Sequence, residues 1–277
     1  MAYEDILYEV SDRVATVTLN RPTKLNAWTQ KMEAEVQEAM LSAGGDSSVR
    51  VIVLTGAGRG FCAGADMGDL DSLSKSGDPA ETVNRLRAHF AGPRIDGALA
   101  DFQKTYSYFP AIGKPIIGAI NGPAAGLGFV ISLYCDLRFA SDQAKFSTAF
   151  ARRGLIAEYG MSWMLPRLVG LANALDLLFS ARLIDAAEAH RLGLVSRVIP
   201  QDQFAAEVRK YALMLASEVS PRSTRVMKRQ VYGALFQNLG EAIDVANEEM
   251  VQSLACQDFK EGVAHFLEKR PPAFTGK

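Results

Sequence analysis

Two segments rich in small residues have the composition of backbone hydrogen-bond donor sites. One spans residues 59–66 (RGFCAGAD) and the other spans residues 121–128 (NGPAAGLG), and each follows a short apolar run. Both lead into a helix-like start, where backbone N–H groups lack intrahelical partners and can bind an anion. Two such donors that converge on one oxygen would form an oxyanion hole. The alternative interpretation is that both segments are tight turns between packed strands and helices.

Other candidate motifs in the chain lack the residue types or the spacing that their function requires. The segment 56–61 (GAGRGF) follows an apolar run, as a dinucleotide-binding loop does, but Phe61 stands where that fingerprint requires glycine. The acidic residues Asp66, Asp69 and Asp71 lack the spacing of a calcium-binding loop, so no metal site is predicted. The 3 cysteines are far apart, which argues against a disulfide framework or a zinc site and favours a reducing cytoplasm.

The elements that must position the two segments alternate between strand and helix. A helix is predicted to begin after Thr29, a good N-cap, and to run to residue 43 with one apolar face. Further apolar patterns predict strands at 6–10, 14–19, 51–55, 115–120 and 137–140, and a buried helix at 127–135. This alternation indicates an α/β fold.

The pattern changes after Pro200, where only helices are predicted. They span residues 202–219, 221–236, 240–256 and 258–269. We therefore predict two regions, a core at residues 1–200 and a helical region at residues 201–277.

The overall composition argues against several classes of partner. The chain has 277 residues and a formal net charge of −1, so no basic field would attract nucleic acid or an anionic membrane. No apolar stretch reaches the roughly 18 residues that a membrane span requires. The acidic first residues are unlike a signal peptide. We therefore expect a cytoplasmic protein with no nucleic-acid or membrane partner.

The two small-residue segments, with Cys135-Asp136 after the second, resemble the signature of the enoyl-CoA hydratase/isomerase (crotonase) superfamily. Similar stretches occur in order at 21–27, 165–170, 186–195 and 261–271, so the resemblance covers nearly the whole chain. It implies a spiral of ββα turns, with C-terminal helices that form a homotrimer or a dimer of trimers. It also implies an acyl-CoA substrate and no separate cofactor, because CoA is part of the substrate.

The resemblance also implies roles for individual residues. The thioester oxygen would bind the backbone N–H groups of Ala65 and Leu127. Leu127 replaces a glycine that is common at this position, but the donor is backbone and is retained. The residues implied in CoA binding are Lys24, Leu25, Ala27, Ala63 and Asp66, together with Phe266 and Lys269, which often act from a neighbouring subunit.

The chain departs from the hydratase pattern at two positions. Hydratases of the family use two glutamates, and Val130 and Phe150 stand in their places here. Glu158 lies where isomerases of the superfamily carry their working acid. Apolar neighbours would desolvate this carboxyl, raise its pKa and strengthen it as a base. The alternative interpretation of Glu158 is a solvated glutamate at a helix start.

The sequence therefore favours an enoyl-CoA isomerase with Glu158 as its base. His89 is a candidate second acid/base, and its alternative interpretation is a solvated helix residue. Competing functions are an enoyl-CoA hydratase (a lyase) or an acyl-CoA hydrolase of fatty-acid or aromatic catabolism, and a non-catalytic CoA-binding protein.

Overall fold

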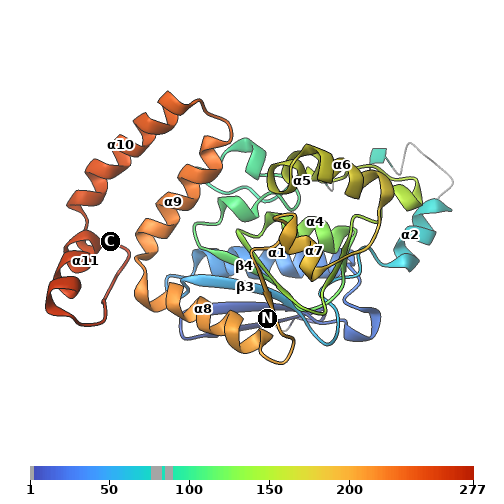
Figure 1. Cartoon of the computed structure of the whole chain (residues 1–277), viewed down its shortest axis with the longest axis horizontal. Helices are drawn as coiled ribbons and strands as arrows, with labels where there is room; N and C mark the ends of the chain where they lie inside the picture. Colours follow the sequence, from blue (N-terminus) through green and yellow to red (C-terminus); the bar gives the residue numbers. More distant parts are fainter. Residues whose placement is uncertain (1–2, 76–82, 85–89) are drawn as a thin grey trace.

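The computed structural model describes residues 3–75, 83–84 and 90–277, and its body is built around a six-stranded sheet (Figure 1). In spatial order the strands are β1 (Ile6–Ser11), β2 (Val14–Leu19), β3 (Val51–Gly56), β4 (Ile116–Ile120), β6 (Leu137–Ser141) and β9 (Arg197–Ile199). β1 and β2 are antiparallel, and every other neighbouring pair is parallel. Residues of β3 are buried on both faces of the sheet, as expected for parallel strands covered by helices.

A second sheet of three short strands lies beside the two donor segments. It contains β5 (Ala124–Ala125), β7 (Lys145–Ser147) and β8 (Ile184–Asp185), and Cys62 extends it through a bridge to Ala124. The chain order β4, β5, α4 (Leu127–Tyr134) is repeated as β6, β7, α5 (Met161–Val169). These repeated ββα turns form the spiral that the sequence predicts.

Helices cover both faces of the large sheet. α1 (Gln30–Gly45) begins after Thr29, whose hydroxyl accepts a hydrogen bond from the N–H of Met32 at 3.1 Å. The buried side of α1 carries Met32, Val36, Ala39 and Met40, the apolar face that the sequence predicts, and also Ala43. α8 (Phe204–Glu218) packs on the opposite face through Phe204, Val208, Ala212 and Ala216.

Shorter elements complete the body. They are α2 (Met67–Ser74), α6 (Leu171–Ser180), α7 (Ala186–Arg191) and the 3₁₀ turns η1 (Pro22–Lys24), η2 (Ala100–Phe102), η3 (Phe109–Ala111) and η4 (Ala151–Arg153). In the described part of the chain, no helix is both long and apolar enough to cross a bilayer.

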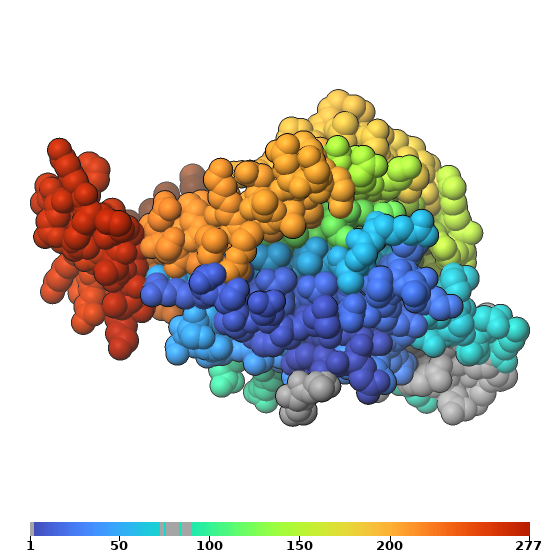
Figure 2. All heavy atoms as spheres, turned by 90° about the horizontal axis from the view of Figure 1, so that it is seen from below, coloured from blue at the N-terminus to red at the C-terminus, as the bar shows by residue number. Residues whose placement is uncertain are grey.

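The last three helices extend away from the body (Figures 1 and 2). α9 (Pro221–Ala234) and α10 (Leu239–Ala255) have no buried residue, and α11 (Gln257–Glu268) buries only Asp258. α9 is attached to the body by Lys228, whose Nζ donates to the carboxylate of Asp136 at 2.8 Å. Because α8 packs on the sheet, the projecting part begins at α9. The boundary at residue 200 is placed between two predicted folding units, a core and a helical region, and it stays a prediction.

Candidate active site

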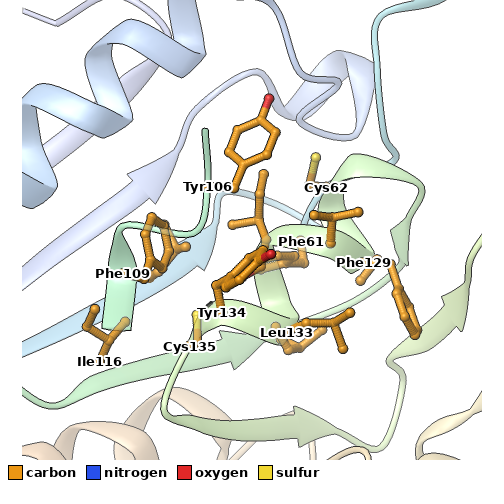
Figure 3. Packing of buried hydrophobic residues seen from close by; sticks show 14 of the residues in the cluster. Phe61, Cys62, Tyr106, Phe109, Ile116, Phe129, Leu133, Tyr134 and Cys135 are labelled. Atoms are coloured by element: carbon orange, nitrogen blue, oxygen red, sulfur yellow. Dashed lines mark hydrogen bonds between the residues drawn. The ribbon is translucent and has the colours of Figure 1, made fainter. Parts of the chain in front are cut away.

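The two donor segments lie side by side because their backbones are bonded directly. The N–H groups of Phe61 and Cys62 both donate to the carbonyl of Pro123, at 3.1 and 3.0 Å, and the N–H of Ala125 donates to Cys62 at 2.9 Å. A Cβ on Gly128 would lie 2.2 Å from the carbonyl oxygen of Cys62, so only glycine permits this approach. Figure 3 shows Phe61 and Cys62 packed in the core beside Phe129 of α4.

The N–H groups of Ala65 and Leu127 have no acceptor among the described residues. On either side of Ala65, Trp28 donates to Gly64 at 2.8 Å and Asp66 donates to Trp28 at 2.9 Å. Leu127 is the first residue of α4, where a helix leaves its N–H groups unpaired. Tight packing therefore brings the two segments together, and each of them offers a free donor.

Both free donors border one cavity of about 1200 Å³. Its walls come from the two donor segments, from the 3₁₀ turns η1 and η2 and from residues 153–160. Most of the lining side chains are apolar or aromatic, with a few polar groups, as in sites for large organic ligands. Leu127 and Phe150 both contribute to this lining.

Glu158 places a carboxylate on the same cavity. The side chain is partly buried, and burial raises the pKa of its carboxyl above the ordinary value. Within the described residues it forms no hydrogen bond or ion pair, while its backbone carbonyl accepts the N–H of Met161 at 3.0 Å. The group is therefore a desolvated and unpaired carboxylate beside two unpaired N–H donors.

Val130 and Phe150 occupy the two positions that carry glutamate in hydratases of the family. Both are apolar, but their surroundings differ. Val130 is fully buried in the core and does not line the cavity. Phe150 does line it, with its ring packed against the same core. Neither side chain can move a proton or activate water.

Tyr134, at the end of α4, is a cavity residue that sequence reasoning missed. Its hydroxyl donates to the carbonyl of Tyr159 at 2.6 Å, and burial raises the pKa of Tyr134 to about 12, so the hydroxyl stays protonated at neutral pH. Only its place at the end of an apolar helix that begins in a donor segment could have drawn attention to it.

The residues implied in CoA binding fall into two groups. Lys24, Ala27, Ala63 and Asp66 line the cavity, whereas Leu25 contributes a carbonyl that accepts the N–H of Ala63 at 3.0 Å. Sequence reasoning did not include Lys104 and Arg153, two further exposed cations on the lining.

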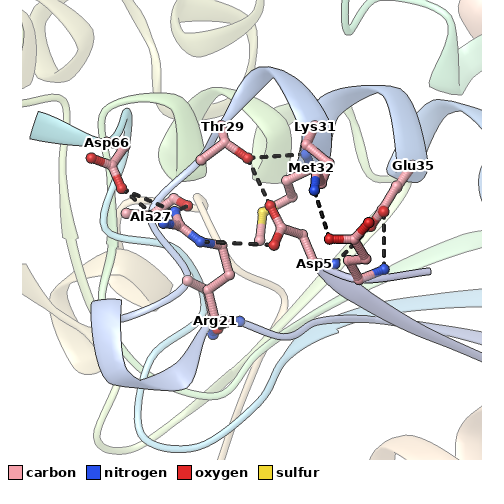
Figure 4. Close-up of polar contacts among 10 residues, drawn as sticks. Asp5, Arg21, Ala27, Thr29, Lys31, Met32, Glu35 and Asp66 are labelled. Carbon is pink, nitrogen blue, oxygen red and sulfur yellow. Dashed lines mark hydrogen bonds and ion pairs between the residues drawn. The ribbon is translucent and has the colours of Figure 1, made fainter. Parts of the chain in front are cut away.

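Asp66 is bound within the protein. Its carboxylate accepts from Arg21 at 3.0 Å (Figure 4) and also accepts the N–H of Gly68 at 2.9 Å. These bonds, with that of Gly68 the larger influence, lower the pKa of Asp66. Its side chain therefore holds the first donor segment in place.

The two C-terminal residues that the resemblance implies in CoA binding are not brought to the cavity by this chain. Phe266 is 78% exposed on α11, and neither it nor Lys269 lines the cavity. His89 lies outside the described residues. No cluster of metal-binding side chains occurs in the part of the chain that is described.

Comparison with known proteins shows where this architecture recurs. The model of the enoyl-CoA hydratase/isomerase family matches residues 9–92 and 95–277. A probable enoyl-CoA hydratase of Mycobacterium bovis is 36% identical over 99% of both chains. The 1,2-epoxyphenylacetyl-CoA isomerase of Escherichia coli is 34% identical over 99% of both chains. The crotonyl-CoA hydratase of Syntrophomonas wolfei is 33% identical over 100% of both.

Solved structures share the fold as well. A crystal structure of an enoyl-CoA hydratase subunit from Geobacillus kaustophilus superimposes with a TM-score of 0.86 at 33% identity, covering 99% of each chain. A putative enoyl-CoA hydratase/isomerase from Mycobacterium abscessus gives a TM-score of 0.87 at 31% identity, covering 98% of this chain and 100% of that one. The chain therefore belongs to the enoyl-CoA hydratase/isomerase family of acyl-CoA-processing enzymes and has the crotonase fold.

Proposed function

We propose that this enzyme moves a double bond within an acyl-CoA by a 1,3-proton transfer, with Glu158 as the base. One observation carries the proposal. The partly buried carboxylate of Glu158 lies on the same cavity as the unpaired N–H groups of Ala65 and Leu127, and burial raises its pKa. A base and an oxyanion hole on one cavity are the two parts that enolate chemistry requires.

The reaction needs no group beyond these three. The thioester oxygen of a 3-enoyl-CoA accepts hydrogen bonds from the N–H groups of Ala65 and Leu127. The carboxylate of Glu158 removes a proton from C2, and the electron pair of that C–H bond delocalises onto the thioester oxygen. The protonated carboxyl then returns the proton to C4, which leaves the double bond between C2 and C3. The two N–H donors lower the barrier because negative charge grows on the thioester oxygen in the transition state.

The other carboxylates on the cavity are less suited to this role. Asp66 is paired with Arg21, and its lowered pKa makes it a weaker base. Asp101 is exposed on η2. A double-bond shift can proceed with one shuttling base, whereas hydration usually employs a second group to activate water or protonate carbon. Among the described residues of the cavity, one carboxylate is suited to act as the base, which favours isomerisation.

Hydration is the second candidate function, because relatives from Mycobacterium bovis and Syntrophomonas wolfei bear hydratase names. In that case another group would hold the water. Acyl-CoA hydrolysis would instead release free CoA. Both alternatives differ from isomerisation in the mass of their products.

We also propose an arrangement for CoA and for the oligomer. Lys24, Lys104 and Arg153 form no ion pair with the described residues, and their charges suit the phosphates of CoA. Large apolar side chains are exposed along α9–α11, including Met227, Val231, Leu239, Val251, Phe266 and Leu267. A homotrimer or dimer of trimers would cover them, and would bring Phe266 and Lys269 to the CoA of a neighbouring subunit. The expected location is the cytoplasm.

The test is a mass-spectrometric product analysis of the full-length protein with 3-hexenoyl-CoA and crotonyl-CoA. We expect 3-hexenoyl-CoA to convert to 2-hexenoyl-CoA with no change in mass, and crotonyl-CoA to remain largely unhydrated. The variant Asp101→Asn should retain most of the activity because its carboxylate is not the base. Rapid gain of one water by crotonyl-CoA, or release of free CoA, would contradict the proposal.

A further inference from the structure

Helix α4 carries a functional group at each of its ends. Leu127, with its free N–H, is its first residue, and Tyr134 is its last (Figure 3). The hydroxyl of Tyr134 donates at 2.6 Å to the carbonyl of Tyr159, the residue directly after Glu158. One helix therefore carries both a proposed donor to the thioester oxygen and a hydrogen bond to the turn that contains Glu158.

The turn that carries Glu158 has a backbone that needs support. Tyr159 has a φ of +49° and Gly160 has a φ of +72°, so two consecutive residues are in the left-handed region. A bulky residue rarely adopts this conformation without contacts that hold it there. The ring of Tyr159 packs edge-on against Tyr106, with ring centres 4.8 Å apart. The ring and the carbonyl of Tyr159 are thus held from two different elements.

Gly160 leaves the space that the hydroxyl of Tyr134 occupies. A Cβ at this position would lie 2.4 Å from that hydroxyl oxygen. The hydroxyl of Tyr134 therefore packs against the Cα of Gly160 while it donates to the carbonyl of Tyr159. Any side chain on residue 160 would displace the tyrosine hydroxyl.

We propose that Tyr134 is a positioning residue, whose hydroxyl fixes the 158–160 turn so that the carboxylate of Glu158 faces the carbon beside the thioester held by α4. This inference rests on the proposed function, because it assigns Glu158 the role of base. Tyr134 itself exchanges no proton with the substrate. Its effect on the reaction passes through the geometry and the solvation of Glu158.

The positioning role predicts a measurable change in the pKa of Glu158, because this pKa depends on how well water is excluded from the carboxyl. Burial is what raises the pKa of Glu158, and Tyr159 is a titratable neighbour, because burial and then the charge of Glu158 raise the pKa of Tyr159. The other titratable groups on the cavity wall are Lys24, Asp66, Asp101, Lys104, Tyr134 and Arg153. A loosened turn would admit water and lower the pKa of Glu158. The acid limb of the activity profile would then move to lower pH.

The test compares Tyr134→Phe with Tyr232→Phe in the full-length protein. Tyr232 is a matched control because its hydroxyl also forms a partly buried hydrogen bond, to Asp136 at 3.0 Å, and the residue does not line the cavity. With 3-hexenoyl-CoA, we expect Tyr134→Phe to lower kcat by about 10-fold to 100-fold, as small misplacements of catalytic groups do, with KM nearly unchanged. Its acid limb in kcat/KM should move to lower pH. Tyr232→Phe should keep both kcat and the pH profile.

Two further variants distinguish a failure of the positioning role of Tyr134 from a failure of the proposed function. Gly160→Ala should reduce kcat in both backgrounds, because alanine is strained at a φ of +72°, but the reduction should be smaller in Tyr134→Phe, where the clashing oxygen is already gone. Glu158→Gln, measured in parallel, tests the base itself. If Glu158→Gln is inactive while Tyr134→Phe keeps wild-type kcat and pH profile, the positioning role is wrong. If Glu158→Gln remains active, the proposed function fails first. A rise in KM without a fall in kcat would also overturn the positioning role.

Discussion

The two walls of the cavity are built in different ways. The oxyanion wall consists of backbone, held by direct bonds between residues 61–62 and Pro123 and by glycines that no larger residue could replace. The other wall consists of side chains on the 150–160 segment, where Glu158 is partly exposed and Tyr159 is in contact with two other tyrosines. The first wall can stabilise an enolate in any reaction of a thioester. In the proposed mechanism, the second decides where the proton goes, and thus which reaction follows.

The largest effect is expected from removing a donor on the backbone wall. Leu127→Pro deletes the N–H at the first helical position, where proline is well tolerated. Turnover should fall by about 10²–10³-fold, as it does when one oxyanion donor is lost. Leu127→Ala keeps the N–H and should be affected far less. Steady-state rates, with thermal unfolding to verify the fold, make the comparison, and equal losses in both variants would mean that the side chain matters instead.

A smaller effect is expected in the pH dependence of activity, which tests the cavity wall made of side chains. Glu158 acts as a base only when ionised, and burial raises its pKa. Activity should therefore fall as pH decreases through this raised pKa, so the acid limb of kcat/KM should lie above the ordinary glutamate value of about 4.3. A profile that stays flat down to that ordinary value would indicate that Glu158 is solvated, as in the alternative interpretation of the sequence.

The smallest effect is expected at the C-terminal helices. Lys269→Ala should weaken acyl-CoA binding by a few-fold without changing kcat, because in the proposed oligomer it removes one phosphate contact at the edge of a neighbouring site. Sedimentation should show a trimer or hexamer for both proteins. A stable monomer at micromolar concentration with full activity would contradict the proposed contribution of a second subunit.

Local signals allowed much of the fold to be predicted. The Thr29 cap and the spacing of apolar residues gave α1 within two residues of its end at Gly45. The buried strands and the helices after Pro200 were predicted in the same way. The strands β5, β7, β8 and β9 were missed because two or three residues are too short to show a periodic pattern.

The site was predictable where it is made of backbone and less so where it depends on distant contacts. Small residues and helix starts reveal the two donor segments, because the composition is local. The bond between Tyr134 and Tyr159 joins residues 25 positions apart, and no sequence pattern announces it. The ion pair of Asp66 with Arg21 spans 45 positions and gives Asp66 a structural task that the resemblance alone did not suggest.

The most direct test of the account is the fate of deuterium in wild-type protein and in Glu158→Gln. Both are incubated with 3-hexenoyl-CoA in D₂O, and the products are analysed by mass spectrometry and NMR. Glu158→Gln preserves shape while removing the basic form, so we expect at least a ~10²-fold loss of isomerisation, with acyl-CoA affinity nearly unchanged. The wild type should form 2-hexenoyl-CoA, with any deuterium confined to C2 and C4. A glutamine variant that keeps most of its activity, or a wild-type product that carries an added water, would contradict the central claim.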